Sequence, residues 1–321
     1  MKNFPILTFE PQFKSVIWGG DRIARFKGLP SQGDTVGESW ELSCVPGHES
    51  VIAAGPFKGQ PFNEVLAAHT DEIMGERLAE RYGTEFPLLI KLIDSADDLS
   101  VQVHPDDTLA RKRHNCPGKT EMWISVDPAE GAYLYSGFNR EITPDEFRRR
   151  IADNTLTEVL GKYNPAKGDV FFLPAGRVHS IGKGNFVLEI QQTSDITYRI
   201  YDYGRRDADG RLRELHPELA LEAIDFSAQE PRKSHRVPDD ATDAPLVECS
   251  HFKVRRIIVD GFRPLPMPEG SLMVVMCIAG DVMLRYPGGE LQLTQGRTAL
   301  IPANLRQLTV EGKGRMLTAC P

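Results

Sequence analysis

Hydrophobic and polar residues alternate with a period of two over much of the chain. Alternation of this kind, interrupted by Gly and Pro, is typical of half-buried β-strands. Clear examples lie at residues 50–54, 86–93 and 99–105. The pattern therefore predicts a mainly β fold.

Apolar residues spaced as on one face of a helix occur in only a few segments. One segment covers residues 62–82, and a second covers residues 143–160 and opens with the letters TPDE. That opening has a Thr cap, a Pro in the first turn and a Glu three residues after the cap, as helix N-termini often do. A third, short helix is predicted to follow His216-Pro217. We expect these helices to be additions to the β framework.

One pattern of glycine, proline and polar residue occurs twice. The sequences GDVFFLPAGRVH (residues 168–179) and GRTALIPANLRQ (residues 296–307) share a glycine, then five residues, a proline and a polar residue five positions later. We interpret them as one hairpin used twice, although such a spacing also recurs by chance in β proteins. Gln307 stands where the first copy has His179. The second copy therefore keeps the packing pattern without the histidine.

A polar, proline-bearing segment at residues 225–245 lies between the two copies and is poor in large apolar residues. Segments of this composition are typical of linkers and surface crossings. We therefore expect two domains, one covering residues 1–238 and the other residues 239–321.

Composition and charge exclude several classes of protein. The chain has 321 residues, 40% of them hydrophobic, and a formal charge of 38 − 45 = −7. This composition excludes general disorder, and the acidic balance argues against broad binding to nucleic acid or to an anionic membrane. No segment has the roughly 18 consecutive apolar residues of a membrane helix.

Five cysteines are scattered along the chain without any CxxC pair. An odd number without paired spacing indicates neither a disulfide framework nor a thiolate zinc site. Together with an N-terminus that has no apolar signal core, this favours a cytoplasmic protein.

Polar side chains gather on one face of two predicted strands. Period-two alternation places Ser100, Gln102 and His104 on the same face, and Glu121 shares a face with Lys119 on another strand. Such a polar face must point into a cavity or into water.

Two histidine nitrogens and two oxygens could come together from Gln102, His104, Glu121 and His179. This donor set suits a borderline divalent ion such as Zn²⁺. Only one donor is charged, so the bound ion would keep a net charge near 2 − 1 = +1 and could polarise a substrate oxygen. The alternative is that each residue is an ordinary hydrogen-bonded side chain, and spacing alone leaves both interpretations open.

These segments resemble a known family. Residues 168–179 resemble the second motif of the cupins, which are double-sheet β-barrels with a metal in the barrel mouth. More specifically, six segments resemble type I mannose-6-phosphate isomerases. They are KLIDSADDLSVQVHPDD (residues 91–107), KTEMW (119–123), PAGRVH (174–179), EIQQTSDITYR (189–199), WGG (18–20) and GESWE (37–41). The resemblance covers about residues 14–226, and a weaker cupin similarity follows at the C-terminal end. It implies two cupin-type jelly-roll barrels, a catalytic one with small helical additions and a C-terminal one without metal.

The resemblance implies that Gln102, His104, Glu121 and His179 bind one Zn²⁺ per chain. The usual cupin HxH is here Gln102-Val103-His104, as in the isomerase family. Glu121 and His179 are only 58 positions apart, which resembles the shorter bacterial members. These members lack a long helical insertion, so any outer wall that the insertion provides is in doubt.

Further residues match the substrate pocket of that family. Arg199 matches the active-site arginine, Lys119 matches a lysine in the pocket, and Ser100 and Arg205 match positions that receive the sugar phosphate. The implied reaction interconverts mannose 6-phosphate and fructose 6-phosphate by moving a proton between C2 and C1 through an enediolate. Glu189, Lys119 and water on the ion all stay open as the base.

Two competing functions have sequence features that weigh against them. A carbohydrate-binding or regulatory cupin without turnover would not need Glu121, Arg199 and Lys119 intact. A redox cupin that uses Fe²⁺ and dioxygen usually has more open coordination than four protein ligands leave. We expect a zinc-dependent isomerase acting on a small sugar phosphate, with no nucleic acid or membrane as partner.

Overall fold

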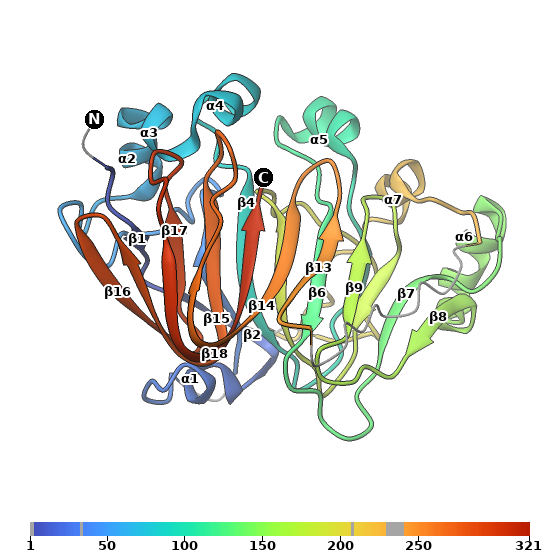
Figure 1. Ribbon diagram of the computed structural model, residues 1–321. Helices are drawn as coiled ribbons and strands as arrows, with labels where there is room; N and C mark the ends of the chain where they lie inside the picture. Colours follow the sequence, from blue (N-terminus) through green and yellow to red (C-terminus); the bar gives the residue numbers. More distant parts are fainter. Residues whose placement is uncertain (1–2, 33–34, 207–208, 229–240) are drawn as a thin grey trace.

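The computed structural model describes residues 3–32, 35–206, 209–228 and 241–321. Its strands form three antiparallel sheets (Figure 1), which confirms the mainly β fold. Among the described strands no sheet closes on itself, so the two expected jelly-roll barrels are not confirmed as closed barrels. Two sheets face each other in the N-terminal part instead, and we call this pair the N-terminal sandwich.

The six-stranded sheet of the sandwich has the order β2 (Gln12–Gly20), β3 (Val36–Leu42), β4 (Leu88–Asp94), β11 (Phe186–Gln192), β6 (Glu121–Ser125) and β9 (Val170–Leu173). The five-stranded sheet has the order β12 (Tyr198–Tyr201), β5 (Val101–Val103), β10 (His179–Ile181), β7 (Leu134–Phe138) and β8 (Leu160–Tyr163). Trp18, Trp123 and Phe171 of the first sheet pack with Leu134 and Ile181 of the second in one buried cluster. The two sheets are therefore packed face to face, with room for a site between them.

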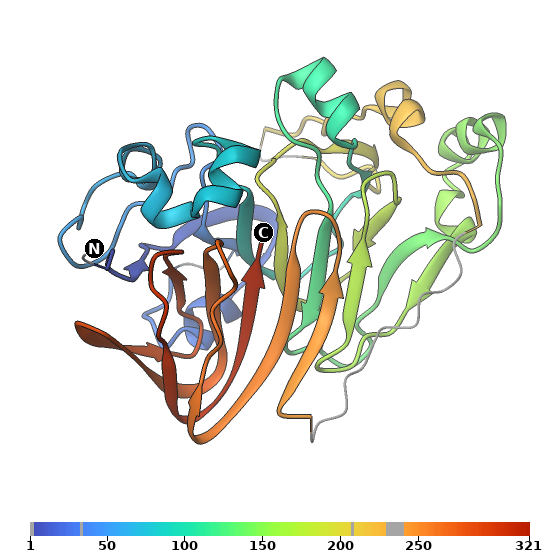
Figure 2. The same ribbon diagram turned by 45° about the horizontal axis from the view of Figure 1, so that its top comes forward.

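The third sheet, which we call the C-terminal sheet, has the order β1 (Leu7–Thr8), β17 (Thr298–Ile301), β15 (Met273–Tyr286), β18 (Thr309–Cys320), β14 (Lys253–Pro264) and β13 (Asp243–Glu248), and β16 (Gly289–Thr294) pairs with β15. One large core joins it to the outer face of the six-stranded sheet, with Met122 and Ile124 on one side and Val274 and Leu317 on the other. A second core lies on the far face of the C-terminal sheet and contains Met273, Val275 and Ile301. Figure 2 shows the C-terminal sheet beside the sandwich.

The expected division at residues 238 and 239 lies outside the described residues. The first strand of the chain pairs with the C-terminal sheet, because Leu7 lies opposite Leu300 in the register of β1 and β17. The N-terminal strand β1 is thus part of the C-terminal sheet, although it is far from the other strands of that sheet in the sequence. The two-domain division stays a prediction.

The helices only partly follow the predicted ranges. Residues 62–82 form three short helices in place of one: α2 (Phe62–Ala68), α3 (Thr70–Met74) and α4 (Glu76–Tyr82). Gly75, between α3 and α4, has φ +80°, and a Cβ there would lie 2.7 Å from the carbonyl oxygen of Gly270. Close packing against the turn that precedes β15 (Met273–Tyr286) therefore requires a glycine at this break.

The helix predicted over residues 143–160 is shorter than expected. It contains α6 (Pro144–Ala152), capped by Thr143 as predicted, and then the 3-10 turn η1 (Leu156–Val159) before β8 begins. The short helix after His216 is confirmed as α7 (Pro217–Ala223). Sequence periodicity missed α1 (Arg22–Phe26) and α5 (Asp107–His114). Of residues 50–54, Val51 and Ile52 make only isolated bridges.

The repeated glycine–proline pattern is a turn and not a hairpin. The first copy, which we call the site turn (residues 168–179), leads from β9 in one sheet to β10 in the other. The second copy, the second turn (residues 296–307), leads from β17 to β18, which are separated by β15. In both cases the strands on either side are not paired with each other. No helix among the described residues is long and apolar enough to cross a membrane.

Candidate metal centre and active site

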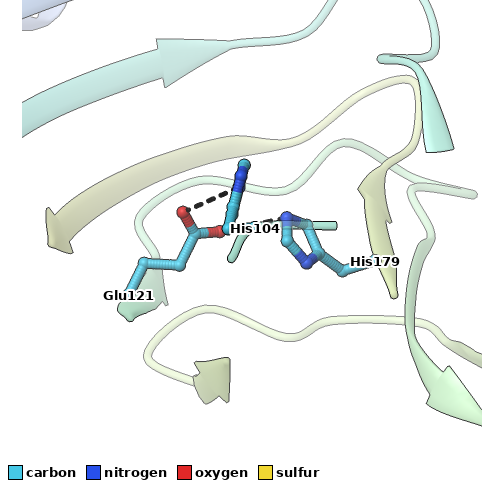
Figure 3. Close-up of side chains that lie close together, drawn as sticks. All are labelled: His104, Glu121 and His179. Atoms are coloured by element: carbon cyan, nitrogen blue, oxygen red, sulfur yellow. Dashed lines mark ion pairs between the residues drawn. The ribbon is translucent and has the colours of Figure 1, made fainter. Parts of the chain in front are cut away.

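Three elements of the sandwich bring the predicted ligands together. Gln102 on β5 lies opposite His179 on β10 in the five-stranded sheet. Glu121 begins β6 of the facing sheet and lies opposite Leu173, the last residue of β9. His104 follows β5 directly. Figure 3 shows His104, Glu121 and His179 pointing toward one another between the two sheets.

The distances define a compact centre. The Nε2 atom of His104 lies 3.4 Å from Glu121 Oε2, and Nε2 of His179 lies 3.3 Å from Glu121 Oε1. The amide nitrogen of Gln102 is 3.3 Å from His179 Nε2. One ligand atom from each of His104, Glu121 and His179 can be chosen so that all lie within 4.8 Å of one another. In the part of the chain that the structure describes, this is the only such group of three or more His, Cys, Asp or Glu residues.

Both imidazoles are oriented by backbone carbonyls. The Nδ1 atom of His104 lies 2.9 Å from the carbonyl oxygen of Ile196, and Nδ1 of His179 lies 2.8 Å from that of Arg177. A carbonyl can only accept, so Nδ1 carries the proton and Nε2 faces the centre with its lone pair. This is the tautomer and orientation that metal-ligating histidines have.

Buried polar atoms at the centre have no hydrogen-bond partner in the protein. They are Nε2 of His104 and both carboxylate oxygens of Glu121, and both residues are at most 1% exposed. Leaving such groups unpaired in the interior is unfavourable by several kcal/mol in order of magnitude. A divalent cation would satisfy all three atoms at once. The residues present therefore fit a metal ion.

The electrostatic environment also favours neutral imidazoles at His104 and His179. Burial lowers the pKa of both imidazoles, and the charge of Lys119 lowers the pKa of His104 further. Both rings are therefore neutral near pH 7, the form that binds metals. Lys119 Nζ lies 3.7 Å from Glu121 Oε2 and is itself buried.

A cavity of ≈ 130 Å³ opens beside the centre. Among the predicted site residues, its lining includes Ser100, Gln102, Lys119, Glu189 and Arg199. Two lysines and two arginines line it against three carboxylates. The excess of positive charge, to which a metal ion would add, favours an anionic ligand.

Glu189 belongs to a buried network on the floor of this cavity. Its Oε2 accepts a hydrogen bond of 2.8 Å from the indole of Trp123, and its Oε1 lies 3.4 Å from Lys91 Nζ without a hydrogen-bond partner. Lys91 also lies 3.9 Å from Glu38. Burial alone would lower the pKa of Lys91, but the carboxylates of Glu38 and Glu189 outweigh it and the net shift is upward. Lys91 is therefore a fixed positive charge.

Arginines gather at one wall of the cavity around a buried carboxylate. Arg199 donates to the carbonyl oxygen of Glu214 at 2.8 Å, while its Nε is buried without a partner. Arg213 lies 3.2 Å from Asp202 Oδ1, an oxygen that it shares with Arg205. Burial, and after it the charge of Arg213, lowers the pKa of Arg199. Neighbouring guanidiniums of this kind stay charged and require an anion.

Arg205 is not among the residues that line the cavity. Its guanidinium is bound to Asp202 and to the carbonyl oxygen of Asp98. Its predicted contact with a phosphate therefore stays a prediction.

Sequence reasoning did not assign several charged residues of the cavity wall to the site, namely Glu38, Lys91, Asp195 and Arg213. Lys91 carried a usable signal, because it is the one charge inside the apolar run at residues 86–93. Arg213 carried none, since it lies in a polar stretch without periodicity.

Comparison with known proteins gives consistent relatives. Residues 6–136 match the phosphomannose isomerase type I catalytic domain, and residues 242–321 match the mannose-6-phosphate isomerase cupin domain. Mannose-6-phosphate isomerase ManA of Bacillus subtilis is 36% identical over 310 residues, covering 95% of this chain and 96% of that protein. The mannose-6-phosphate isomerase of Streptococcus mutans is 39% identical over 316 residues, covering 95% of each chain.

Solved structures share the whole fold. The crystal structure of the Bacillus subtilis mannose 6-phosphate isomerase aligns with a TM-score of 0.87 and 29% identity, covering 98% of this chain and 99% of that one. A zinc-bound mannose 6-phosphate isomerase aligns with a TM-score of 0.79 at 15% identity, covering 98% of each, which shows the fold alone. With full-length relatives above 30% identity, the chain belongs to the type I mannose-6-phosphate isomerase family.

Proposed function

We propose that the chain is a zinc-dependent isomerase that interconverts mannose 6-phosphate and fructose 6-phosphate through an enediolate. The observation that carries the proposal is the set of buried, unpartnered ligand atoms of His104 and Glu121 beside a positively charged cavity. Such a centre would stabilise negative charge that develops on a substrate oxygen. Family membership gives the sugar phosphate as the substrate class.

Gln102, His104, Glu121 and His179 would hold one Zn²⁺ between the two sheets of the sandwich. When bound there, the ion would supply Lewis-acid stabilisation of the enediolate oxygens. The carbonyl contacts of Ile196 and Arg177 would keep both imidazoles in ligand orientation. No rearrangement of the histidines would then be needed for binding.

Proton transfer between C2 and C1 requires a base that faces the cavity. Glu189 meets this requirement best, because its Oε1 is buried and lacks a hydrogen-bond partner while Trp123 holds the other oxygen. Lys91, 3.4 Å away, would stabilise the carboxylate each time it loses the proton. Lys119 lies beside Glu121 and would serve as a second cation near the substrate oxygens.

The phosphate would lie at the arginine wall. Ser100 and Arg213 line the cavity there, and Asp202 is shared between Arg205 and Arg213, which leaves Arg199 to stabilise the enediolate. A dianionic phosphate would neutralise the guanidinium charge that Asp202 does not balance. Anchoring the phosphate would hold the two reacting carbons near Glu189 and the metal.

The cupin interpretation belongs to the same proposal. The two facing sheets of the sandwich would form one jelly roll, and the C-terminal sheet, whose residues 242–321 match a cupin domain, would form the other. The proposed division into residues 1–238 and 239–321 follows from this.

The test is a coupled assay with mannose 6-phosphate on purified, metal-free and zinc-restored protein. We expect no turnover without metal and turnover after addition of one equivalent of Zn²⁺. Tight binding of mannose 6-phosphate without any turnover in the zinc form would favour a carbohydrate-binding or regulatory cupin. Equal turnover with and without metal would contradict the zinc dependence.

A further inference from the structure

The two adjacent aspartates of the motif QVHPDD do different things. Asp106 caps helix α5, because its Oδ1 accepts a hydrogen bond of 2.8 Å from the backbone N–H of Leu109. Asp107 points elsewhere, and its Oδ1 accepts hydrogen bonds from the backbone N–H of Gly118 at 2.8 Å and from the side-chain amide of Gln192 at 2.9 Å. Both donors belong to segments that lead to the metal centre.

Gln192 connects this carboxylate to the strand that carries the acidic ligand. Its Oε1 accepts a hydrogen bond of 2.9 Å from the backbone N–H of Thr120, which lies between Lys119 and Glu121. Gln192 is only 6% exposed, so water does not compete freely with its bond to Thr120, whereas its bond to Asp107 is only partly buried because the Asp107 side chain is 54% exposed. Thr120 is therefore held from Asp107 through one buried amide.

The other contacts of this region tie the three ligand-bearing segments to one another. The backbone N–H of Lys119 donates to the carbonyl oxygen of Pro105, next to His104, at 3.1 Å. The hydroxyl of Thr120 accepts from the N–H of Ala175, in the site turn that ends at His179, at 3.2 Å. At Gly118 a Cβ would lie 2.6 Å from the backbone nitrogen of Asp107, so the two segments are in direct contact.

We propose that Asp107 is a positioning residue for the metal centre, acting through Gln192 and Gly118 on the segment that carries Lys119 and Glu121. It touches neither metal nor substrate. Partners behind the ligands of a metal commonly change its affinity by about 10- to 100-fold when they are removed. This inference rests on the metal site of the proposed function.

The test measures Zn²⁺ affinity by competition with a chelator, together with the visible spectrum of the Co²⁺-substituted protein. Asp107→Ala removes the acceptor, so we expect Zn²⁺ to bind about 10- to 100-fold more weakly and the Co²⁺ spectrum to change. Asp107→Asn keeps an acceptor oxygen for Gly118 and Gln192, and its amide can face the half-exposed side. We expect Asp107→Asn to restore affinity to within about threefold of the unaltered chain, the tolerance expected for an intact acceptor.

Asp106→Ala is the matched control, because it removes the cap of the same helix one residue away. It should lower the melting temperature and leave Zn²⁺ affinity unchanged. An affinity loss in Asp106→Ala equal to that in Asp107→Ala would overturn the inference in favour of plain helix stability. Unchanged affinity in Asp107→Ala would overturn it and leave the proposed function intact, whereas an unaltered chain that binds no Zn²⁺ would contradict both.

Discussion

The site turn and the second turn share two backbone features and present different side chains. Each begins at a glycine of positive φ, +87° at Gly168 and +78° at Gly296. Each closes with the same hydrogen bond, from Arg177 to Pro174 and from Leu305 to Pro302, both 3.1 Å long. His179 is then buried and faces Glu121, whereas Gln307 is exposed.

The strand pairing at the two turns also differs only in the side chains that are brought opposite each other. Leu173, within the site turn, lies opposite Glu121, and Ile301, in the matching place of the second turn, lies opposite Met273. Met273 is buried in the apolar core on the far face of the C-terminal sheet. A shared scaffold thus encloses a polar centre in one place and an apolar core in the other, and the difference lies in a few side chains.

The largest effect should come from making the first turn resemble the second. We expect His179→Gln to lose the metal, and kcat/KM should fall by more than the about 10²–10³-fold typical of losing one charge-stabilising donor. The fold should survive, because the second turn exists with Gln307 in the same place. Metal analysis, circular dichroism and the coupled assay check this, and one equivalent of metal in His179→Gln would contradict the ligand assignment.

A substitution next to the second turn should destabilise the fold without affecting the metal centre. Lys27 Nζ, buried, donates at 2.5 Å to the carbonyl oxygen of Gly296 and at 2.5 Å to Glu41. Lys27→Met leaves Glu41 buried without its partner, so the free energy of unfolding should fall by about 3–5 kcal/mol. Chemical denaturation measures the loss.

The double variant Lys27→Met with Glu41→Leu is the control. It removes both charges and should recover part of the lost stability. Zn²⁺ affinity should stay unchanged in both variants. A large loss of affinity would show that the second turn supports the centre after all.

Substitutions of the arginines near the polar cavity should distinguish residues that act in the chemical step from residues that bind the substrate. We expect Arg199→Ala to lower kcat and kcat/KM together by about 10²–10³-fold, since its guanidinium would stabilise charge that develops on the enediolate. Arg205→Ala and Arg213→Ala should mainly raise KM for phosphorylated substrates. Steady-state kinetics decides, and a near-normal kcat with raised KM in Arg199→Ala would move that residue into the phosphate site.

The smallest effect is expected when the second turn is made to resemble the first. Gln307→His places an imidazole on an exposed position with Met273 where the acidic ligand would be needed. Stability should change by no more than about 0.5 kcal/mol, as for ordinary surface substitutions. Metal bound at the C-terminal sheet of this variant would show that the histidine alone makes the site.

The sequence predicted those features that depend on local alternation. Period two correctly placed Gln102 and His104 on one side of β5, and it separated Glu121 from Met122, which packs in the core on the opposite face. The pattern of glycine and proline identified the two related segments, although their interpretation as hairpins was wrong. These features depend only on residues that are close in the sequence, so each can be predicted from a single segment.

What the sequence could not provide depends on long-range pairing or on polar segments. Gln102 and His179 lie opposite each other in the sheet, although they are 77 positions apart in the sequence. Helix α5 has only Ala110 buried, so it shows almost no apolar periodicity. Alternation could not predict the helix break at Gly75, which depends on its contact with Gly270 in the turn between β14 and β15.

The most direct test of the account is an anomalous difference map at the zinc absorption edge from crystals grown with Zn²⁺. We expect one peak per chain, within about 2.0–2.2 Å of the ligand N and O atoms of Gln102, His104, Glu121 and His179. No peak should appear near Met273 or Gln307. A peak at the C-terminal sheet, or none between the two sheets of the sandwich, would contradict the central claim.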